Sequence, residues 1–310
     1  MTTNIDRPGT GSGPVLDIDN LKVTFATDAG DVFAVKDVSL EVNPGEVVAI
    51  VGESGSGKTV TAKTILGLLP ETAVSSGAVL INGNNVISVS AAKLRQIRGR
   101  DVAMVFQEPS TALNPVFTVG WQIAEGIRAH ADTGSGKKIT AKEAKARAIE
   151  ALRKVGIPDP ETRVNYYPHQ FSGGQKQRVV IAAALALNPG LIVADEPTTA
   201  LDVTVQAEIL ELLRDLRDKY GTSIVLITHN MGVVADLADR VVVMYQGDVV
   251  EEASARVLFA QPKEDYTKKL LAAVPHLGRN SASQGMTERA HQGGKVLVEA
   301  KNLTIEYPGR

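Results

Sequence analysis

The amino-acid sequence predicts an α/β domain built on a mostly parallel β-sheet. Four short runs are apolar on both faces and rich in β-branched residues, as buried parallel strands are. Amphipathic helical patterns such as Gln206–Lys219 lie among them, and alternating strands and helices are typical of a parallel sheet. The four runs are Val47–Val51, Leu191–Ala194, Ile224–Ile227 and Val241–Met244.

The flanking stretches predict two additions to this sheet. Val15–Val42 alternates apolar and polar residues, which indicates an antiparallel β subdomain. Strand patterns fade between Pro109 and Pro168, so we expect a helical subdomain over about 109–187. Within it, Ile139–Val155 is an amphipathic helix pattern with Thr140 as its N-cap and Gly156 as its stop.

Composition and charge exclude several classes of protein. The 310 residues carry 33 Lys and Arg against 35 Asp and Glu, and this balance gives no whole-chain attraction to nucleic acid or anionic lipid. Cysteine is absent, which excludes disulfides, thiolate zinc sites and cysteine-ligated iron–sulfur clusters. The longest apolar run, Val179–Leu187, is far shorter than the ~20 residues of a membrane span. Work at a membrane would therefore go through partners.

The two ends of the chain carry different patterns. Met1–Pro14 is rich in Thr, Gly, Ser and Pro, lacks the pattern of a secretory signal and is expected to be a disordered tail. Val296–Tyr307 repeats the pattern of Val15–Phe25, after a polar, linker-like stretch. We expect one domain over 15–275, a linker over 276–295 and the start of a second copy over 296–310. The alternative is two similar edge strands.

The stretch Gly52–Thr59 fits the phosphate-loop pattern G-x-x-x-x-G-K-[ST] in full, between a predicted strand and a predicted helix, Lys58–Leu68. Its glycines let backbone N–H groups converge on phosphate oxygens, and the helix adds its positive end. Lys58 would contact the β- and γ-phosphates and the Thr59 hydroxyl would bind Mg²⁺. The alternative is a glycine-rich turn without a ligand. This pattern predicts a P-loop NTPase (RecA-like) core, with nucleotide bound by Gly52, Ser54, Gly55, Ser56, Gly57, Lys58, Thr59 and Val60.

Two further motifs suit the same chemistry. Asp195 and Glu196 end an apolar strand, where Asp195 would hold Mg²⁺ and Glu196 would orient or deprotonate the attacking water. The alternative is an N-cap before Pro197. A second glycine motif, Ser172, Gly173, Gly174 and Gln175, opens the helical pattern Gln175–Leu187. Ser172 can cap this helix, whose free N–H groups suit an anion; the alternative is a capped helix without a ligand.

Ser-Gly-Gly-Gln between a phosphate loop and an Asp-Glu strand resembles the signature of ATP-binding cassette (ABC) ATPases. The resemblance implies that Gln107 is a Mg²⁺ ligand that senses the metal and the attacking water, and that it links to a transmembrane partner. It also implies that His229 contacts the γ-phosphate, that Asp202 belongs to a loop at the nucleotide, and that Phe25 stacks on adenine, with Tyr307 as its equivalent in the repeat. Phe25 could instead be core, and Asp202 could also cap the next helix.

Finer resemblance indicates the peptide- and nickel-importer branch. Glu108–Pro115 and Asp195–Gln206 are similar to the corresponding stretches of that branch. Tyr266-Thr267, followed by Leu270–Pro275, resembles its C-terminal extension, expected over about 251–275. Two features depart from that pattern: Glu264-Asp265 stand where many members have His-Pro, and no cysteine cluster is present for an iron–sulfur centre.

The resemblance implies an ATPase with ATP and Mg²⁺ as cofactors, peripheral on the cytoplasmic face of the membrane. Its implied partners are two transmembrane permease subunits, a second ATPase domain in the same chain or a paralogue, and an extracytoplasmic solute-binding protein, without nucleic acid. The ATP would lie between the phosphate loop of one domain and the Ser-Gly-Gly-Gln of another. The cargo, whether dipeptide, oligopeptide, glutathione, nickel or opine, stays open.

Two other classes compete with the importer. Soluble ABC ATPases of ribosomes or DNA tend to carry long basic linkers, coiled-coil inserts or zinc cysteines, which this sequence does not show. A non-catalytic nucleotide-binding regulator would not need Glu196, Gln107 and His229 together.

Overall fold

The computed structural model describes residues 13–28, 30–131, 139–199 and 201–273. The chain divides into two compact units, Met1–Ala273 and Val274–Arg310. The second unit lies outside the described residues. The predicted repeat and its linker, and residues 1–12 of the predicted tail, therefore stay predictions.

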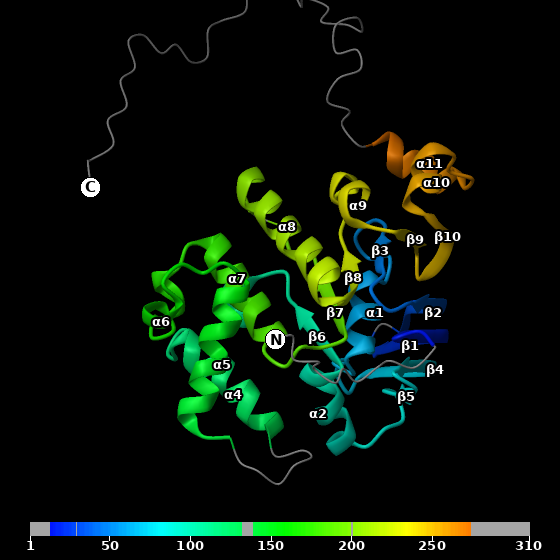
Figure 1. Cartoon of the computed structure of the whole chain (residues 1–310). Coiled ribbons are helices and arrows are strands. Elements are labelled where there is room, and N and C mark those ends of the chain that lie inside the picture. The colour runs from blue at the N-terminus through cyan, green and yellow to red at the C-terminus, as the bar shows by residue number, and fades with distance from the viewer. Residues whose placement is uncertain (1–12, 29, 132–138, 200, 274–310) are drawn as a thin grey trace, which may run out of the picture. The chain divides into compact units, whose positions relative to one another are not determined.

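One ten-stranded sheet runs through the described part of the chain (Figure 1). Its order is β5-β4-β1-β2-β10-β9-β3-β8-β7-β6. The strands are β1 (Leu16–Thr27), β2 (Gly30–Val42), β3 (Val47–Val51), β4 (Ala73–Ile81), β5 (Asn84–Asn85), β6 (Val102–Val105), β7 (Leu191–Asp195), β8 (Ser223–Ile227), β9 (Arg240–Tyr245) and β10 (Asp248–Ser254).

The parallel part of the sheet comprises β9, β3, β8, β7 and β6. Its first four strands are the apolar runs that the sequence predicts, and every residue of β3, β7 and β8 is buried. The sequence reasoning missed β6, because this strand has only four residues and directly follows the basic end of a helix. It also missed β4, β5 and β10.

The antiparallel strands β1, β2, β4 and β5 confirm the alternating pattern near the N-terminus. They are not a separate sheet, however, because β2 joins β10 through the pair Asp37 and Asp248. The N–H of Lys36 donates to the Gly247 carbonyl at 2.9 Å, and its ammonium pairs with Asp248 at 3.3 Å. The sheet is therefore mixed, with a narrow junction between its two parts.

Helices cover both parts of this sheet, and α4 to α7 gather beside β6 (Figure 1). Their bounds are α1 (Lys58–Ile65), α2 (Ala91–Arg100), α3 (Pro109–Ala112), α4 (Val119–Ala131), α5 (Ala141–Lys154), α6 (Pro160–Arg163), the 3₁₀ helix η1 (Pro168–Gln170), α7 (Gly173–Leu185), α8 (Val203–Tyr220), α9 (Met231–Leu237), α10 (Ala255–Ala260) and α11 (Asp265–Ala272). None of these helices is both long and apolar enough to cross a bilayer.

Local chemistry sets the ends of these helices. Thr140 caps α5 as predicted, its hydroxyl accepting from the Glu143 N–H at 3.2 Å. The helix after the phosphate loop ends at Ile65, not at Leu68, because Gly67 adopts a φ of +62°. Helix α7 lies two residues nearer the N-terminus than the predicted Gln175–Leu187 at both of its ends.

Two apolar cores lie on opposite faces of the sheet. Along β7, Ile192 and Ala194 join the core beneath α4, α5, α7 and α8, whereas Leu191 and Val193 join the core that includes α1 and the antiparallel strands. Successive side chains of a strand point to opposite faces, so both faces of a parallel strand must be apolar. This burial fixes the strands whose ends carry the candidate site.

Candidate active site

The predicted functional residues follow the carboxyl ends of neighbouring parallel strands. The phosphate loop follows β3, and Gln107 lies two residues beyond β6. Asp195 ends β7, with Glu196 directly after it, and His229 lies two residues beyond β8. Because the order β3-β8-β7-β6 is contiguous, these ends meet at one edge of the sheet, where ligands bind in open α/β folds.

Close backbone contacts explain the glycines of the phosphate loop. A Cβ on Gly52 would lie 2.2 Å from the Met244 carbonyl oxygen, and one on Gly57 would lie 2.6 Å from that of Ala34. Gly55 has open space around it but a φ of +80°. No side chain caps α1 at Gly57, so the first N–H groups of α1 are free of side-chain acceptors, as phosphate binding requires.

The Lys58 ammonium lies within the loop. Its Nζ donates to the carbonyl oxygens of Gly52 (2.8 Å) and Glu53 (2.7 Å) and contacts the Ser56 hydroxyl at 3.3 Å. Burial lowers the pKa of Lys58, and the negative charges of Glu196, Asp195 and Glu53 only partly offset this. The cation is thus held inside the loop by two backbone carbonyl oxygens and one hydroxyl.

Asp195 and Thr59 form a pair of oxygen donors beside this loop. The Thr59 hydroxyl donates to Asp195 Oδ1 at 3.4 Å. Burial raises the pKa of Asp195, which the hydrogen bond from Thr59 opposes and the charge of Glu196 reinforces. Mg²⁺ prefers oxygen ligands and is commonly held by one or two protein groups together with substrate phosphates. This pair fits such a site, although the described residues contain no group of three or more His, Cys, Asp or Glu side chains arranged to hold a metal ion.

Glu196 is the centre of a polar network. Its Oε2 accepts from Gln107 Nε2 at 3.0 Å and from the Thr199 hydroxyl at 2.8 Å, and His229 Nδ1 lies 3.0 Å from its Oε1. Burial raises its pKa, but the hydrogen bonds from His229 and Thr199 and the charge of Lys58 outweigh burial, so the pKa of Glu196 is lowered. Its carboxylate is therefore ionised at neutral pH and able to accept a proton.

The backbone of Glu196 is unusual. Its φ is +48°, in the left-handed region that residues with a Cβ seldom adopt, and Pro197 follows it. Its N–H donates to the Ile227 carbonyl at 2.8 Å, which ties the residue to the end of β8.

The sequence reasoning predicted no role for Thr199, although it lies in the Glu196–Pro197–Thr198–Thr199 stretch. The available signal was a hydroxyl three residues after an acidic residue at a turn, where a side chain can bond back locally. Gln107, predicted as a Mg²⁺ ligand, bonds Glu196 in the structure, not Asp195 or Thr59.

The Ser172–Gln175 motif bonds to itself. The Ser172 hydroxyl accepts from the Gln175 N–H at 3.3 Å and Gln175 Oε1 accepts from the Ser172 N–H at 3.2 Å, a reciprocal cap on α7. A Cβ on Gly174 would lie 2.3 Å from Val205 Cγ1, so this glycine lets α7 approach α8. Gly173 is exposed.

Asp202 and Phe25 have structural contacts of the kind that the sequence left open beside their predicted nucleotide roles, which stay predictions. Asp202 Oδ1 accepts from the Val205 N–H at 3.0 Å and caps α8. Phe25 on β1 is half-buried against the core that includes α1, as is Val60, while Ser54 is exposed. Tyr307 lies outside the described residues.

A family model described as ABC transporter matches residues 35–199, which span the phosphate loop, Ser172–Gln175 and Glu196. The chain belongs to this family. ABC transporter relatives include the dipeptide transport ATP-binding protein DppD of Bacillus subtilis, 49% identical over 270 residues, which are 86% of this chain and 79% of that protein. The oligopeptide transport ATP-binding protein OppD of Bacillus subtilis is 49% identical over 85% of this chain and 72% of that protein. The peptidoglycan transport ATP-binding protein YejF of Agrobacterium fabrum is 50% identical over 96% of this chain, but only 53% of that protein is covered.

Solved ABC structures share the fold. The ATP-binding cassette MJ0796, a dimer in a post-hydrolysis state bound to ADP and Pi, aligns with a TM-score of 0.68 and 32% identity over 78% of this chain and 99% of that one. The cbiO1 protein of Clostridium perfringens, part of the ABC transporter complex cbiONQ, has a TM-score of 0.66 and 29% identity over 81% and 92% of the two chains. The predicted ABC ATPase fold and activity class are confirmed.

Proposed function

We propose that this ABC ATPase powers the import of dipeptides or oligopeptides through partner membrane subunits. Support comes from the relatives that are 49% identical over most of both chains and are named as dipeptide and oligopeptide transport ATP-binding proteins. The single observation that carries the ATPase chemistry is the position of the Glu196 carboxylate beside the phosphate loop, bonded to Gln107, Thr199 and His229.

In the proposed reaction, Lys58 and the backbone N–H groups of the loop and of α1 bind the phosphates of ATP. Glu196 accepts a proton from the water that attacks the γ-phosphorus, which breaks the bond to ADP. Gln107 and His229 hold the carboxylate of Glu196 in place, and His229, which is largely exposed, can turn toward a phosphate oxygen. Mg²⁺, held by Thr59 and Asp195, would neutralise charge on the phosphates.

Ser172–Gln175 and Asp202 are proposed to complete a nucleotide site on a second ATPase domain. In the described residues, the side chains of Ser172, Gln175 and Asp202 hydrogen-bond only near their own helix ends, which leaves the start of α7 to another domain. The relative MJ0796 is a dimer with ADP and Pi, which supports this arrangement. The repeat at Val296–Tyr307 supports a second domain on the same polypeptide, with a paralogue as the alternative.

The helical subdomain is proposed to dock on one of two partner permease subunits, which would place the protein on the cytoplasmic face of the membrane. Phe117 and Trp121 stack with ring centroids 4.2 Å apart, and both are exposed, as is Val116 at 70%. These side chains follow Gln107 by about ten residues, so a docked partner could act on the Glu196 network. An extracytoplasmic solute-binding protein would deliver the peptide.

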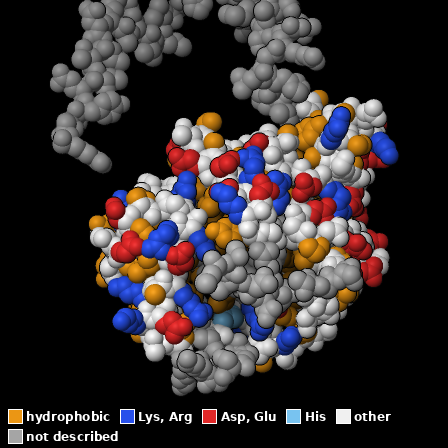
Figure 2. Space-filling model, in the orientation of Figure 1, with side chains coloured by type: hydrophobic (Ala, Val, Ile, Leu, Met, Phe, Trp, Pro, Cys, Tyr) orange, Lys and Arg blue, Asp and Glu red, His pale blue; other side chains and the backbone are white. Residues whose placement is uncertain are grey.

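A detergent pull-down of the chain from its native membranes, followed by mass spectrometry, tests this function. Two multi-span proteins and a solute-binding protein are expected. Ribosomal or DNA-repair proteins without membrane proteins would contradict the importer. On the face that Figure 2 shows, Lys and Arg are mixed with Asp and Glu over the helical subdomain, which favours the first outcome because a nucleic-acid surface would be mainly basic.

A further inference from the structure

The phosphate loop is bonded to the C-terminal helix α11. The N–H of Glu53, the second residue of the loop, donates to the Tyr266 hydroxyl at 3.1 Å across 213 residues of sequence. Tyr266 lies in the first turn of α11. The proposed reaction assigns no role to this contact.

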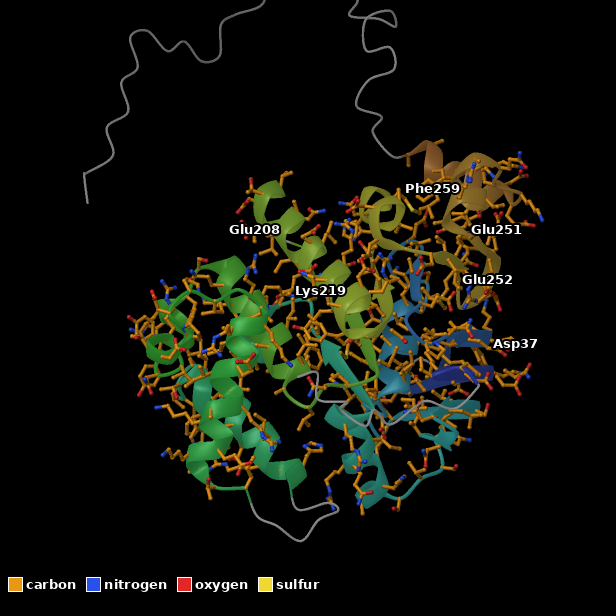
Figure 3. All side chains as sticks on the ribbon, in the orientation of Figure 1. Asp37, Glu208, Lys219, Glu251, Glu252 and Phe259 are labelled. Atoms are coloured by element: carbon orange, nitrogen blue, oxygen red, sulfur yellow. The ribbon has the colours of Figure 1, made fainter. Side chains whose placement is uncertain are left out.

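A buried carboxylate fixes the start of α11. Glu251 on β10 accepts from the N–H groups of Lys263 at 2.9 Å and Glu264 at 3.0 Å, directly before the helix. Burial raises the pKa of Glu251, but hydrogen bonds from neighbouring groups outweigh it and lower the pKa, so the anion persists. Figure 3 labels Glu251 where β10 approaches α10 and α11. The helix is thereby anchored to the sheet.

The β9–β10 hairpin contacts both α11 and the phosphate loop. The rings of Tyr245, at the end of β9, and Tyr266 have centroids 4.4 Å apart. In the turn, the N–H of Gly247 donates to the Ser56 carbonyl at 3.1 Å. The outer side of the phosphate loop is therefore held at two places, by Tyr266 near its start and by Gly247 near its end.

We propose that Tyr266 is a positioning residue for nucleotide binding, which sets the shape of the phosphate loop through the Glu53 peptide. One planar peptide unit, between Gly52 and Glu53, carries both halves of the connection, because the Glu53 N–H bonds Tyr266 and the Gly52 carbonyl oxygen accepts from Lys58 Nζ at 2.8 Å. Fixing the first group restricts where the second can point, and thus where the Lys58 cation lies. The inference rests on the proposed role of this loop in binding nucleotide.

The experiment measures the Kd for Mg-ATP with the full chain, by calorimetry in the Glu196→Gln background so that ATP is not consumed. Tyr266→Phe keeps the ring contact with Tyr245 and removes the acceptor. Loss of one neutral hydrogen bond that holds the competent loop raises the Kd about three- to tenfold. Tyr245→Phe is the matched control, because its hydroxyl accepts from Gln246 and not from the loop. Its Kd is expected within twofold of the parent.

Amide hydrogen exchange over residues 52–57 gives a readout that does not need nucleotide. Exchange at Glu53 is faster in Tyr266→Phe and unchanged in Tyr245→Phe. Equal exchange and equal Kd in Tyr266→Phe and its parent would overturn the proposal. A drop in thermal stability with an unchanged Kd would also overturn it, since Tyr266 would then only stabilise the fold.

Two further variants separate the possible failures. Glu251→Ala removes the carboxylate that anchors the start of α11. The double variant Glu251→Ala, Tyr266→Phe should have the same Kd as Tyr266→Phe alone. A further rise in the Kd of the double variant would contradict an effect of Glu251 that acts through Tyr266. Lys58→Ala tests the loop itself. If Lys58→Ala leaves the Kd unchanged, the proposed nucleotide site fails. If Lys58→Ala abolishes binding while Tyr266→Phe is neutral, only the positioning role fails.

Discussion

The two edges of the parallel sheet use charge in opposite ways. At the amino edge, Arg240 forms a two-pronged ion pair with Glu46, at 2.8 and 3.1 Å, and also pairs with Glu252. At the carboxyl edge, Asp195 and Glu196 are like charges placed side by side, near the buried cation Lys58.

The difference supports a division of roles, in which the amino edge stabilises the fold and the carboxyl edge carries the proposed chemistry. At the amino edge, the positive charge of Arg240 is paired within the chain with the negative charges of Glu46 and Glu252. The adjacent carboxylates at the carboxyl edge repel each other and raise the pKa of Asp195 further, which favours binding of a cation there. Substitutions at the two edges should therefore separate turnover from stability, and each of the following variants tests that separation.

Glu196→Gln should have the largest effect. The amide keeps the shape of the side chain but cannot accept a proton, so we expect kcat to fall about 10²- to 10⁴-fold. ATP affinity and the melting temperature should stay close to wild type. Steady-state ATPase assays measure the change, with the exposed Glu161→Gln as control. Turnover within a few fold of wild type would remove Glu196 from the role of base.

Lys58→Ala should come next. Removing the cation from the loop is expected to weaken Mg-ATP binding by roughly 30-fold or more, about 2 kcal/mol by the tenfold-per-1.4 rule. Lys63→Ala, on the exposed side of the same helix, should change affinity much less. Equilibrium binding measures the Kd of both variants for Mg-ATP. Equal Kd values for Lys58→Ala and Lys63→Ala would contradict the carboxyl edge as the phosphate site.

Arg240→Ala should lower stability without affecting the site. The side chain is mostly buried and its loss leaves Glu46 without a counter-charge, so we expect about 2–3 kcal/mol less free energy of unfolding. Urea denaturation measures this, and Arg147→Ala, in an exposed helix pair, should cost about 0.5 kcal/mol or less. A large loss of ATP affinity by Arg240→Ala, at temperatures where it is folded, would contradict the separation of the two edges.

Glu46→Gln should have the smallest effect, and one that depends on pH. Burial raises the pKa of Glu46, but its bonds with Arg240 and Asn43 outweigh this and lower the pKa from 4.5. A lowered folded-state pKa gives stability that is present above the unfolded pKa and is lost as pH falls through the folded value. Glu46→Gln should cost about 1 kcal/mol at pH 7, and the difference should shrink below pH 4.5. A constant difference in urea titrations from pH 7 to 3.5 would refute this.

The sequence predicted most of the parallel sheet and the residues that gather at its carboxyl edge. Runs such as Ile224–Ile227 are apolar at every position, and motifs such as Gly52–Thr59 directly follow a run. Parallel strands bring their carboxyl ends together, so local patterns were sufficient to predict that Lys58, Asp195 and Glu196 lie close.

Other features depend on contacts that no local pattern encodes. The bond between Glu53 and Tyr266 and the junction of Asp37 with Asp248 join residues about 200 positions apart. Strand β4 contains Ser75-Ser76-Gly77, a poor strand sequence that becomes a strand because β1 pairs with it. Thr199 was missed because its one local signal, a hydroxyl three residues after an acidic residue at a turn, does not distinguish a bond to that side chain from a bond to the backbone.

The left-handed backbone at Glu196 has a consequence for engineering and selection. A residue with a Cβ in that region costs roughly 1–2 kcal/mol, a cost that glycine escapes and asparagine reduces. A screen that rewards only thermal stability would therefore favour replacing the residue that the proposed reaction depends on. Stabilised libraries of this protein should be screened for turnover in parallel, because the most stable backbone at the end of β7 and an intact carboxylate are competing demands on one position.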